Sequence, residues 1–421
     1  MIASKFGVSA EEIIAVNKIE NPNFLTVGNQ IIIPGLEGVT GNLTAEVIPL
    51  GSTLDGLSIQ HQFPISMLTK LNKITSPQEI FAGSSLILPV SDQASLRNVQ
   101  ILRSGEALSE TSVRINLNPW IVAIQNNLDE TWQAIPSRPL YYSSSAPDNN
   151  QPNSILPNLK NLQFDELPLT QGHTVEITAS GEPGLQVSGH LNGYTLHFFS
   201  TQDGRYLALQ GIYAMTEPGL VNFDMTINKA DSESYSFSQR ILVQSGYYPE
   251  DPMLSVDPAT IDPAVVKPEE DQIRKLASQV TPQQLWSGKF RDPVDEPICY
   301  KSTFGNRRAY NGGPYSSFHA GLDYGVCANL NIYAPAAGVV VFAGPLTVRG
   351  NSTIIDHGLG VFTGYWHQSE IKVNVGEHVE PGQLIGLIGD TGRVTGPHLH
   401  WEIWVNGAQV NPIQWLEKTY P

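Results

Sequence analysis

Charged side chains are scarce in this sequence, and basic ones are scarcer than acidic ones. Lys, Arg, Asp and Glu make up 15% of the 421 residues, and the formal net charge is −16. Basic residues form no cluster anywhere along the chain, so we do not expect nucleic acid as a partner. The sequence also lacks a run of about 18 apolar residues, so we expect no membrane-spanning helix.

Cysteine is nearly absent. Cys299 and Cys327 are the two cysteines, and they lie 28 positions apart. In an oxidising compartment they could form a disulfide, and otherwise they would be two separate buried thiols. Both alternatives stay open, because a sequence does not give the distance between two Cβ atoms.

A conventional secretion signal is absent as well. The first residues, MIASKFGVSAEEIIAVNKIENP, contain no basic segment followed by an apolar run. Two interpretations are compatible with this start: a cytoplasmic protein, or a sequence whose upstream part is missing.

Glycine and proline, in contrast, are abundant, with 37 and 30 residues, and hydrophobic residues make up 41% of the chain. This mixture favours short strands and loops over long charged helices. The length predicts two to four domains. We therefore predict a multidomain, mainly β protein.

An internal repeat occupies the N-terminal part of the chain. Residues 3–34 and 50–89 share a pattern of two short helices, a glycine-containing turn and an apolar strand that closes on proline. Gly51, Thr53 and Leu54 lead into the second copy, and the first copy lacks this lead-in. The pattern resembles the LysM module, a small α+β fold, and the resemblance implies binding of N-acetylglucosamine-containing chains such as peptidoglycan.

The repeat predicts three modules. We expect a partial LysM module over residues 1–35, a complete one over 45–91 and a degenerate LysM-like one over 98–146. A helical spacer without affinity is the alternative, most of all for the third copy. Because the first copy starts without its opening strand, we expect the natural sequence to continue upstream with that strand and an export signal.

The middle of the chain has a different pattern. Residues 166–248 contain short alternating runs separated by Gly, Asn, Asp and Pro, which is typical of a β-sandwich with Ig-like architecture. Residues 249–285 carry three Asp-Pro steps and a short helical run, so we expect a connector that packs on its neighbours.

Histidines are concentrated near the C-terminus. Six of the ten lie between residues 319 and 400, and two segments, HAGLD and HLH, place His319 with Asp323 and His398 with His400. Residues two apart on a strand share a face. A catalytic zinc uses imidazole and carboxylate donors and keeps one position open for water. The residues alone do not decide which histidine of the pair would be a ligand, and two ordinary half-buried histidines are the alternative.

The surrounding motifs carry a more specific resemblance. FGNRR, HAGLDYG, YWH and GDTGRVTGPHLHWEI, spread over about residues 286–416, resemble the lysostaphin-type (LytM-like) zinc metallo-endopeptidases of peptidoglycan. We therefore predict a peptidase domain over residues 286–421, built on an antiparallel β-sheet. The resemblance implies Zn²⁺ as the cofactor and these roles: metal ligands His319, Asp323 and His400; an acid–base pair His367 and His398; substrate contacts Tyr315 and Arg307.

Several assignments within this set stay open. Either His367 or His398 could be the base, Tyr310 competes with Tyr315, and Arg308 could act beside Arg307. Glycine bridges and direct D-amino-acid cross-links are cleaved by the same zinc chemistry, so the motifs do not select the bond.

The prediction is a zinc endopeptidase that hydrolyses peptide cross-links of bacterial peptidoglycan while LysM modules hold the glycan. The alternative is a non-catalytic peptidoglycan-binding regulator or activator of other cell-wall hydrolases. The presence of all five motif positions favours the enzyme. This substrate implies an extracytoplasmic location, secreted or in the cell envelope, and the incomplete first module favours export over a cytoplasmic protein.

Overall fold

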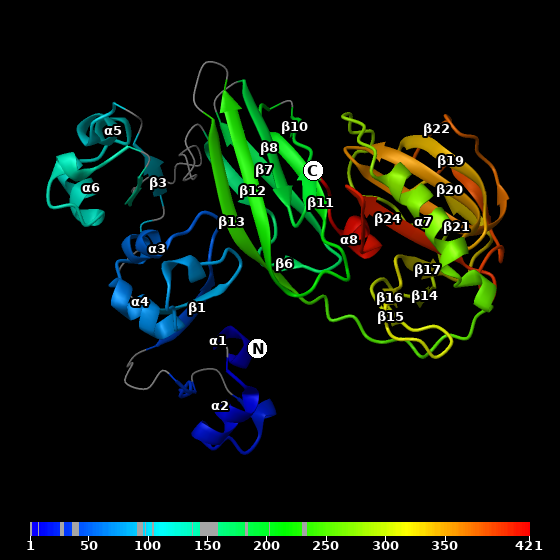
Figure 1. Cartoon of the computed structure of the whole chain (residues 1–421), viewed down its shortest axis with the longest axis horizontal. Coiled ribbons are helices and arrows are strands. Elements are labelled where there is room, and N and C mark those ends of the chain that lie inside the picture. The colour runs from blue at the N-terminus through cyan, green and yellow to red at the C-terminus, as the bar shows by residue number, and fades with distance from the viewer. Residues whose placement is uncertain are drawn as a thin grey trace. The chain divides into compact units, whose positions relative to one another are not determined.

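The computed structural model describes most of the chain, namely residues 2–6, 8–25, 29–35, 42–90, 96, 98–102, 105–136, 138–143, 159–181, 184–201, 203–229 and 234–421. The chain divides into two compact units, residues 1–162 with 239–242 and residues 163–238 with 243–421 (Figure 1).

The first unit contains three small groups of elements in the order helix, helix, 3₁₀ turn. The second and third groups are flanked by a strand on each side, and the two strands pair antiparallel in each case. The described part of the first group has helices and a turn but no strand. The elements are α1 (Ile2–Phe6), α2 (Ala10–Asn17) and η1 (Pro22–Phe24); β1 (Leu43–Val47), α3 (Leu54–His61), α4 (Ile65–Asn72), η2 (Pro77–Glu79) and β2 (Ser85–Pro89); β3 (Asn98–Ile101), α5 (Leu108–Arg114), α6 (Pro119–Gln125), η3 (Thr131–Gln133) and β4 (Pro139–Tyr142).

One asparagine recurs at the same place in all three groups. The side-chain amides of Asn17, Asn72 and Asn126 each donate to the carbonyl four residues earlier and to a carbonyl fifteen residues later. Each side-chain oxygen also accepts from the backbone amide of that later residue. The asparagine therefore ties the end of the second helix to the closing segment, and residues 98–142 share this feature with the two preceding groups.

The second unit begins with two antiparallel sheets. Their strand orders are β10-β11-β7-β5 and β6-β13-β12-β8-β9. Phe164 of the first sheet contacts Phe223 of the second edge-to-face, with ring centroids 5.1 Å apart, so the sheets share an apolar interior. The strands are β5 (Leu159–Phe164), β6 (Leu169–Thr170), β7 (Thr174–Gly181), β8 (Leu185–Leu191), β9 (Tyr194–Leu196), β10 (Phe199–Ser200), β11 (Tyr206–Gly211), β12 (Gly219–Lys229) and β13 (Tyr235–Gln244).

This part starts earlier than the sequence indicates. The prediction places its first residue at 166, but β5 already belongs to the sheet through its neighbour β7. The Ig-like description of these sheets stays a prediction.

A ten-stranded sheet forms the C-terminal part. Its main path runs β14-β17-β24-β21-β20-β19-β22, with β18, β23 and β25 attached beside it. The strands are β14 (Tyr300–Ser302), β17 (Leu322–Tyr324), β18 (Asn331–Tyr333), β19 (Gly338–Leu346), β20 (Gly350–Gly358), β21 (Val361–Ile371), β22 (His378–Val379), β23 (Leu384–Ile388), β24 (Leu399–Val405) and β25 (Ala408–Val410); the short pair β15 (Arg307–Arg308) and β16 (Ser317–Phe318) lies outside the sheet, and helix α8 (Pro412–Glu417) follows it.

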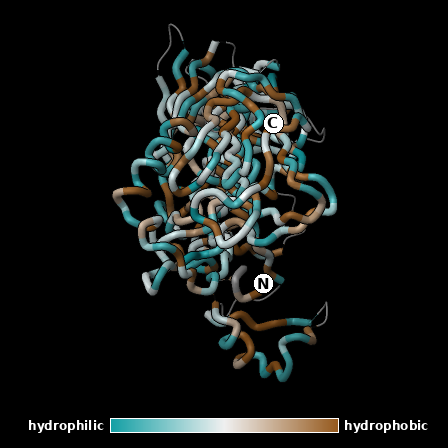
Figure 2. Tube along the Cα trace, turned by 90° about the vertical axis from the view of Figure 1, so that its right-hand side faces the viewer, coloured by the Kyte–Doolittle hydropathy of each residue, from teal (hydrophilic) through white to brown (hydrophobic). Residues whose placement is uncertain are grey.

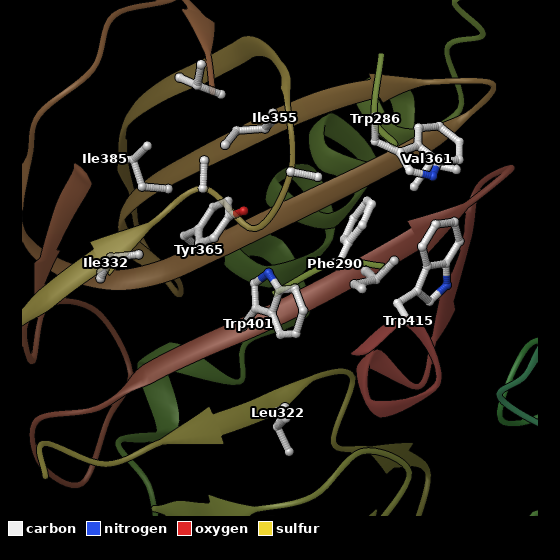
Figure 3. Close-up of a cluster of buried hydrophobic side chains, with 14 of the residues drawn as sticks. Trp286, Phe290, Leu322, Ile332, Ile355, Val361, Tyr365, Ile385, Trp401 and Trp415 are labelled. Carbon is white, nitrogen blue, oxygen red and sulfur yellow. The ribbon is translucent and has the colours of Figure 1, made fainter. Parts of the chain in front are cut away.

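The two faces of strand β24 have different surroundings. Trp401 of β24 and Tyr365 of the neighbouring strand point into the main hydrophobic core (Figure 3), and Ile403 belongs to the same core. Alternation places His400 and Glu402 on the opposite face. The sheet thus separates an apolar core from a face that carries polar side chains.

Helix α7 (Pro263–Ala277) covers one end of the polar face. Its Ile273 and Ala277 are buried against Phe362, Trp366 and Trp404 of the sheet. The segment before the helix runs beside β15, since the amide of Asp251 donates to the Arg307 carbonyl and that of Leu254 to the Ala309 carbonyl. The predicted connector is therefore built into the C-terminal part.

Cys299 and Cys327 form a disulfide, with their Cα atoms 6.2 Å apart. The sequence leaves open a disulfide or two separate buried thiols, and the structure contains the disulfide. Hydrophobic stretches along the trace are interrupted by hydrophilic ones (Figure 2), and no helix among the described residues is long and apolar enough to cross a bilayer.

Candidate metal centre and catalytic cleft

A cavity of about 570 Å³ opens on the polar face of the sheet. All five residues that the sequence singles out as ligands and acid–base pair line it: His319, Asp323, His367, His398 and His400. The connector and α7 form another part of its wall, through Leu254, Val256, Ile261, Val266, Glu270 and Arg274.

Three donor atoms converge within this cavity. Asp323 on β17 lies directly opposite His400 on β24, and His319 precedes β17. His319 Nε2 is 3.0 Å from Asp323 Oδ1 and 2.9 Å from His400 Nδ1, and the latter is 2.8 Å from the same carboxylate oxygen. Two imidazole nitrogens and a carboxylate oxygen are a ligand set that zinc uses.

Hydrogen bonds on the outer side of each ring fix which nitrogen faces the centre. His319 donates from Nδ1 to the Thr303 carbonyl (2.8 Å), and His400 donates from Nε2 to Glu402 Oε1 (3.1 Å). The opposite nitrogens, His319 Nε2 and His400 Nδ1, both face Asp323 Oδ1; each can donate a proton to that oxygen or, in the neutral ring, offer its lone pair to a metal ion at the centre. Metal-bound histidines usually have such outer partners, which fix the tautomer.

Negative charge is concentrated at this centre. Burial would raise the pKa of Asp323, but its hydrogen bonds with His319 and His400 hold the pKa well below its usual range. Burial would also raise the pKa of Glu402, and hydrogen bonding to His400 lowers it to about 2. Burial would lower the pKa of His400, yet these two carboxylates raise it. The converging donor atoms fit a metal ion, and the negative charge around His400 that favours a proton there also favours a metal cation.

His367 and His398 form a second pair in the same cavity, with ring centroids 5.0 Å apart. Each donates from Nδ1 to a main-chain carbonyl, His367 to Thr391 and His398 to Gly396, both at 2.8 Å. Their Nε2 atoms therefore remain acceptors. Burial lowers the pKa of His398, and burial with the charge of His400 lowers that of His367 to about 3. Both rings are consequently neutral near pH 7 and able to accept a proton.

A bulge in β21 directs His367 into the cavity. Between Tyr365 and Gln368 this strand has one residue more than its partner β20, and His367 has a φ of 65°. On a regular strand His367 would point away from the face that carries Trp366, because neighbouring side chains alternate. The bulge and the left-handed backbone reorient the side chain, as is common beside active sites.

The structure places the other predicted site residues outside the cavity lining. The Arg307 guanidinium donates to the Ala214 carbonyl (2.8 Å) and lies over the Tyr248 ring, and the Tyr315 hydroxyl donates to the Asp251 carbonyl (2.9 Å). The alternatives Arg308 and Tyr310 do line the cavity.

Sequence reasoning did not identify Glu402 as a site residue. It is 2% exposed and, besides His400, accepts hydrogen bonds from Trp404 Nε1 (2.7 Å) and Gln409 Nε2 (3.0 Å). Its position two residues after His400 was a usable signal, because residues two apart on a strand share a face.

Sequence reasoning also missed a link between α7 and the site. Glu269, 6% exposed, accepts from the backbone amides of Val348 and Arg349 and from Arg349 Nη1 (3.0 Å). The carbonyl of Arg349 in turn accepts from the backbone amide of His367 (2.8 Å). No sequence signal connects Glu269 with a hairpin 80 residues away.

His357 is buried outside this cavity. It bonds the Ala337 carbonyl and the Thr363 hydroxyl, both at 2.8 Å, and burial lowers its pKa to about 4. These contacts agree with the structural role that its position in the core suggests.

The polar sheet face thus brings together imidazole and carboxylate donors that could hold a metal ion. Residues 317–412 match Peptidase family M23, and residues 1–34 and 48–89 match the LysM domain. The chain thus carries an M23 metallopeptidase domain together with LysM domains, as the sequence motifs predict.

Relatives share the peptidase part of the chain. It is 40% identical over 124 residues to the peptidoglycan DD-endopeptidase ShyA of Vibrio cholerae, covering 30% of this chain and 29% of the relative. It is 43% identical over 95 residues to the DD-carboxypeptidase/endopeptidase Mpg of Neisseria meningitidis, covering 23% and 22%. The matches therefore span less than a third of either relative. The catalytic domain of lysostaphin from Staphylococcus simulans is a structural neighbour with 28% identity and a TM-score of 0.23, covering 32% of this chain and 92% of that domain.

Proposed function

We propose that this protein is a zinc-dependent endopeptidase that hydrolyses peptide cross-links of bacterial peptidoglycan. The observation that carries the proposal is the pairing of two different histidine sets in one cavity. One set, with Asp323, presents lone pairs to a common point, and the other presents two neutral imidazoles beside it.

His319 Nε2, Asp323 Oδ1 and His400 Nδ1 would hold the zinc ion, which when bound would polarise the scissile carbonyl and acidify a water molecule. The residues of the chain then move the protons. His398 or His367 accepts a proton at Nε2 as the water attacks, and a proton passes from the same pair to the leaving amine. The lowered pKa values leave both imidazoles unprotonated at the start of a turnover, but a pKa of about 3 makes His367 the weaker candidate for the base, because a general base works best with a pKa near the operating pH.

The lining of the cavity supports the substrate-contact roles of Arg308 and Tyr310 more directly than those of Arg307 and Tyr315. In this proposal Arg308 takes the place that the sequence motifs assign to Arg307. Its guanidinium is 3.8 Å from Asp323 Oδ2 and so lies next to the metal ligands.

The N-terminal modules would attach the enzyme to glycan. We include residues 98–146 as a third, LysM-like module, because Asn126 makes the same three contacts as Asn17 and Asn72. The two-sheet part would be an Ig-like spacer over residues 166–248 with β5 added. A peptidoglycan substrate implies work outside the cytoplasm, in the envelope or after secretion.

Digestion of sacculi tests the activity. The zinc-loaded protein should bind about one zinc ion per chain and release muropeptides whose peptide cross-links are cut. Analysis of the products identifies the bond. Zinc binding without any cleavage would favour the alternative function, a non-catalytic regulator of other hydrolases.

Deletion of residues 1–145 tests the role of the modules. Binding to insoluble peptidoglycan should weaken, whereas cleavage of a small soluble peptide should stay nearly unchanged, because tethering raises local concentration without altering the chemistry. Equal loss of both would contradict a tethering role.

A further inference from the structure

Four arginines line the cavity: Arg274, Arg308, Arg349 and Arg393. This is a notable concentration, because the whole chain has 24 basic residues and a net charge of −16. Glu270, Asp323 and Glu402 line the same cavity, so the arginines attract an anionic group of a ligand only where no carboxylate pairs with them. The partners of each arginine show which of them is available for that purpose.

Two of the four arginines already pair with carboxylates, so they can still contact a substrate but their charge is partly neutralised. Arg308 pairs with Asp251 at 3.2 Å, and Arg349 pairs with Glu269 at 3.0 Å. Among the described residues, Arg393 has no such ion pair. Arg274 also lacks one, but it is exposed and therefore hydrated.

Arg393 is held in place without being neutralised. Its Nη1 donates to the Thr260 carbonyl (2.9 Å), and its guanidinium lies over the Tyr310 ring, 5.0 Å from the centroid. Its Nε and Nη2 have no protein acceptor in the part of the chain that the structure describes. The side chain is half-buried; burial lowers its pKa, the charges of Arg349 and Arg308 act in the same direction, and Tyr310 and the carboxylate of Glu269 act against it. A partly buried cation without a directly paired carboxylate is costly unless a ligand supplies one.

The position of Arg393 relates it to the reacting groups. It lies in the loop between β23 and β24, between Thr391 and Gly396. The carbonyls of those two residues orient His367 and His398. An anion bound at Arg393 would therefore be bound by the loop that positions the acid–base pair.

We infer that Arg393 binds a carboxylate of the substrate peptide and makes the enzyme selective for peptides that carry this charge near the cleaved bond. The two remaining guanidinium donors suit a carboxylate, which guanidinium can bind through two parallel hydrogen bonds. Peptide bridges made only of glycine offer no such group. This inference rests on the proposed function and adds a substrate class to it.

The test uses two soluble cross-linked peptides that differ in one group, a free carboxylate or a carboxamide beside the scissile bond. The zinc-loaded full chain should cleave the carboxylate peptide with a kcat/KM about 10- to 100-fold higher, the range expected for a charge-assisted pair. Arg393→Gln should lose that preference by slowing only the carboxylate peptide. Arg393→Lys should keep part of it, because the charge remains and the two-pronged geometry is lost.

Arg291→Gln is a matched control. Arg291 also donates to a main-chain carbonyl and lies over a tyrosine ring, 5.4 Å from the centroid of Tyr333, but it does not line the cavity. This variant should keep the wild-type preference, and circular dichroism should show all variants folded.

Three results would overturn the inference. The wild type could cleave both peptides equally well, or Arg393→Gln could slow both equally, which would indicate a role in loop structure alone. No cleavage of either peptide or of sacculi by the zinc-loaded wild type would instead overturn the proposed function, and the inference with it.

Discussion

The two halves of the cleft differ in the charge that lies beside their histidines. On the side of β17 and β24, His319 and His400 contact Asp323, and Glu402 lies behind His400. On the side of the β23–β24 loop, His367 and His398 donate to uncharged main-chain carbonyls. Both arrangements fix a tautomer, but only the first adds negative charge. Carboxylates therefore mark the half that suits a cation, and carbonyls mark the half that keeps imidazoles neutral.

Removal of a ligand should have the largest effect. We expect His400→Ala to lower zinc content and to bring peptide cleavage down to background, because the variant retains only two of the three donor atoms. Zinc stoichiometry by atomic absorption and cleavage of a soluble peptide measure both. A His400→Ala protein that keeps its zinc would contradict the division of the cleft.

Substitution in the other half should separate turnover from metal content. His398→Ala and His367→Ala should retain zinc and lose about 100- to 10,000-fold in turnover, which is the usual contribution of acid–base assistance. Zinc content and kcat of the purified variants are the measurements. Loss of metal from His398→Ala, together with retention by His400→Ala, would show that the two roles are exchanged.

The carboxylate behind the ligand half should have a smaller effect. Glu402→Gln keeps a hydrogen-bond acceptor for His400 but removes the charge. We expect an approximately 10- to 100-fold loss of zinc affinity, typical of outer partners of metal ligands. Competition with a zinc chelator gives the affinity. If Glu402→Gln and wild type release zinc at the same chelator concentration, the charge at this position has no role in binding.

His357 is a third kind of histidine for this comparison: it is buried, has no carboxylate partner among the described residues and does not line the cavity. Its pKa is about 4 in the folded protein, below the 6.5 of the free side chain. The unfolded chain therefore takes up this proton first, so stability is complete above pH 6.5 and falls as the pH drops towards 4. The slope is at most about 1.4 kcal/mol per pH unit for one histidine.

His357→Gln isolates this contribution. Urea unfolding of wild type and variant at pH 7.5, 6 and 5 should show a flatter pH dependence for the variant. Parallel curves would mean that another group titrates over this range.

The sequence motifs predicted the site residues more completely than they predicted the fold. Asp323 and His400 come from strands that pair directly, and His319 lies in the short segment before β17, so the HAGLD and HLH motifs already contained the residues that converge. Glu402 was within reach of the alternation argument. The orientation of the His367 side chain into the cavity depends on a one-residue bulge in β21, and no local sequence pattern predicts that bulge.

Two features that the sequence did not predict, the arginine that faces the cavity and the start of the two-sheet part, depend on contacts between distant segments. Arg307 and Arg308 are neighbours, and which of them faces the cavity is set by residues of the connector and of the two-sheet part, such as Asp251 and Ala214. Likewise β5 joins its sheet through pairing with a later strand, in a stretch whose composition indicates a linker.

The carboxylate of Glu269 also bears on how the enzyme should be produced. Helix α7 precedes the stretch that matches the peptidase family, yet Glu269 receives two backbone amides of the hairpin at Val348 and Arg349. A fragment beginning at residue 286 would exchange the Glu269 carboxylate for water at those amides and so lose two charge-assisted hydrogen bonds that hold the hairpin. It would also uncover the apolar surface of Trp404 that α7 buries. A preparation that begins at residue 286 should therefore be less stable and less active than one that includes helix α7.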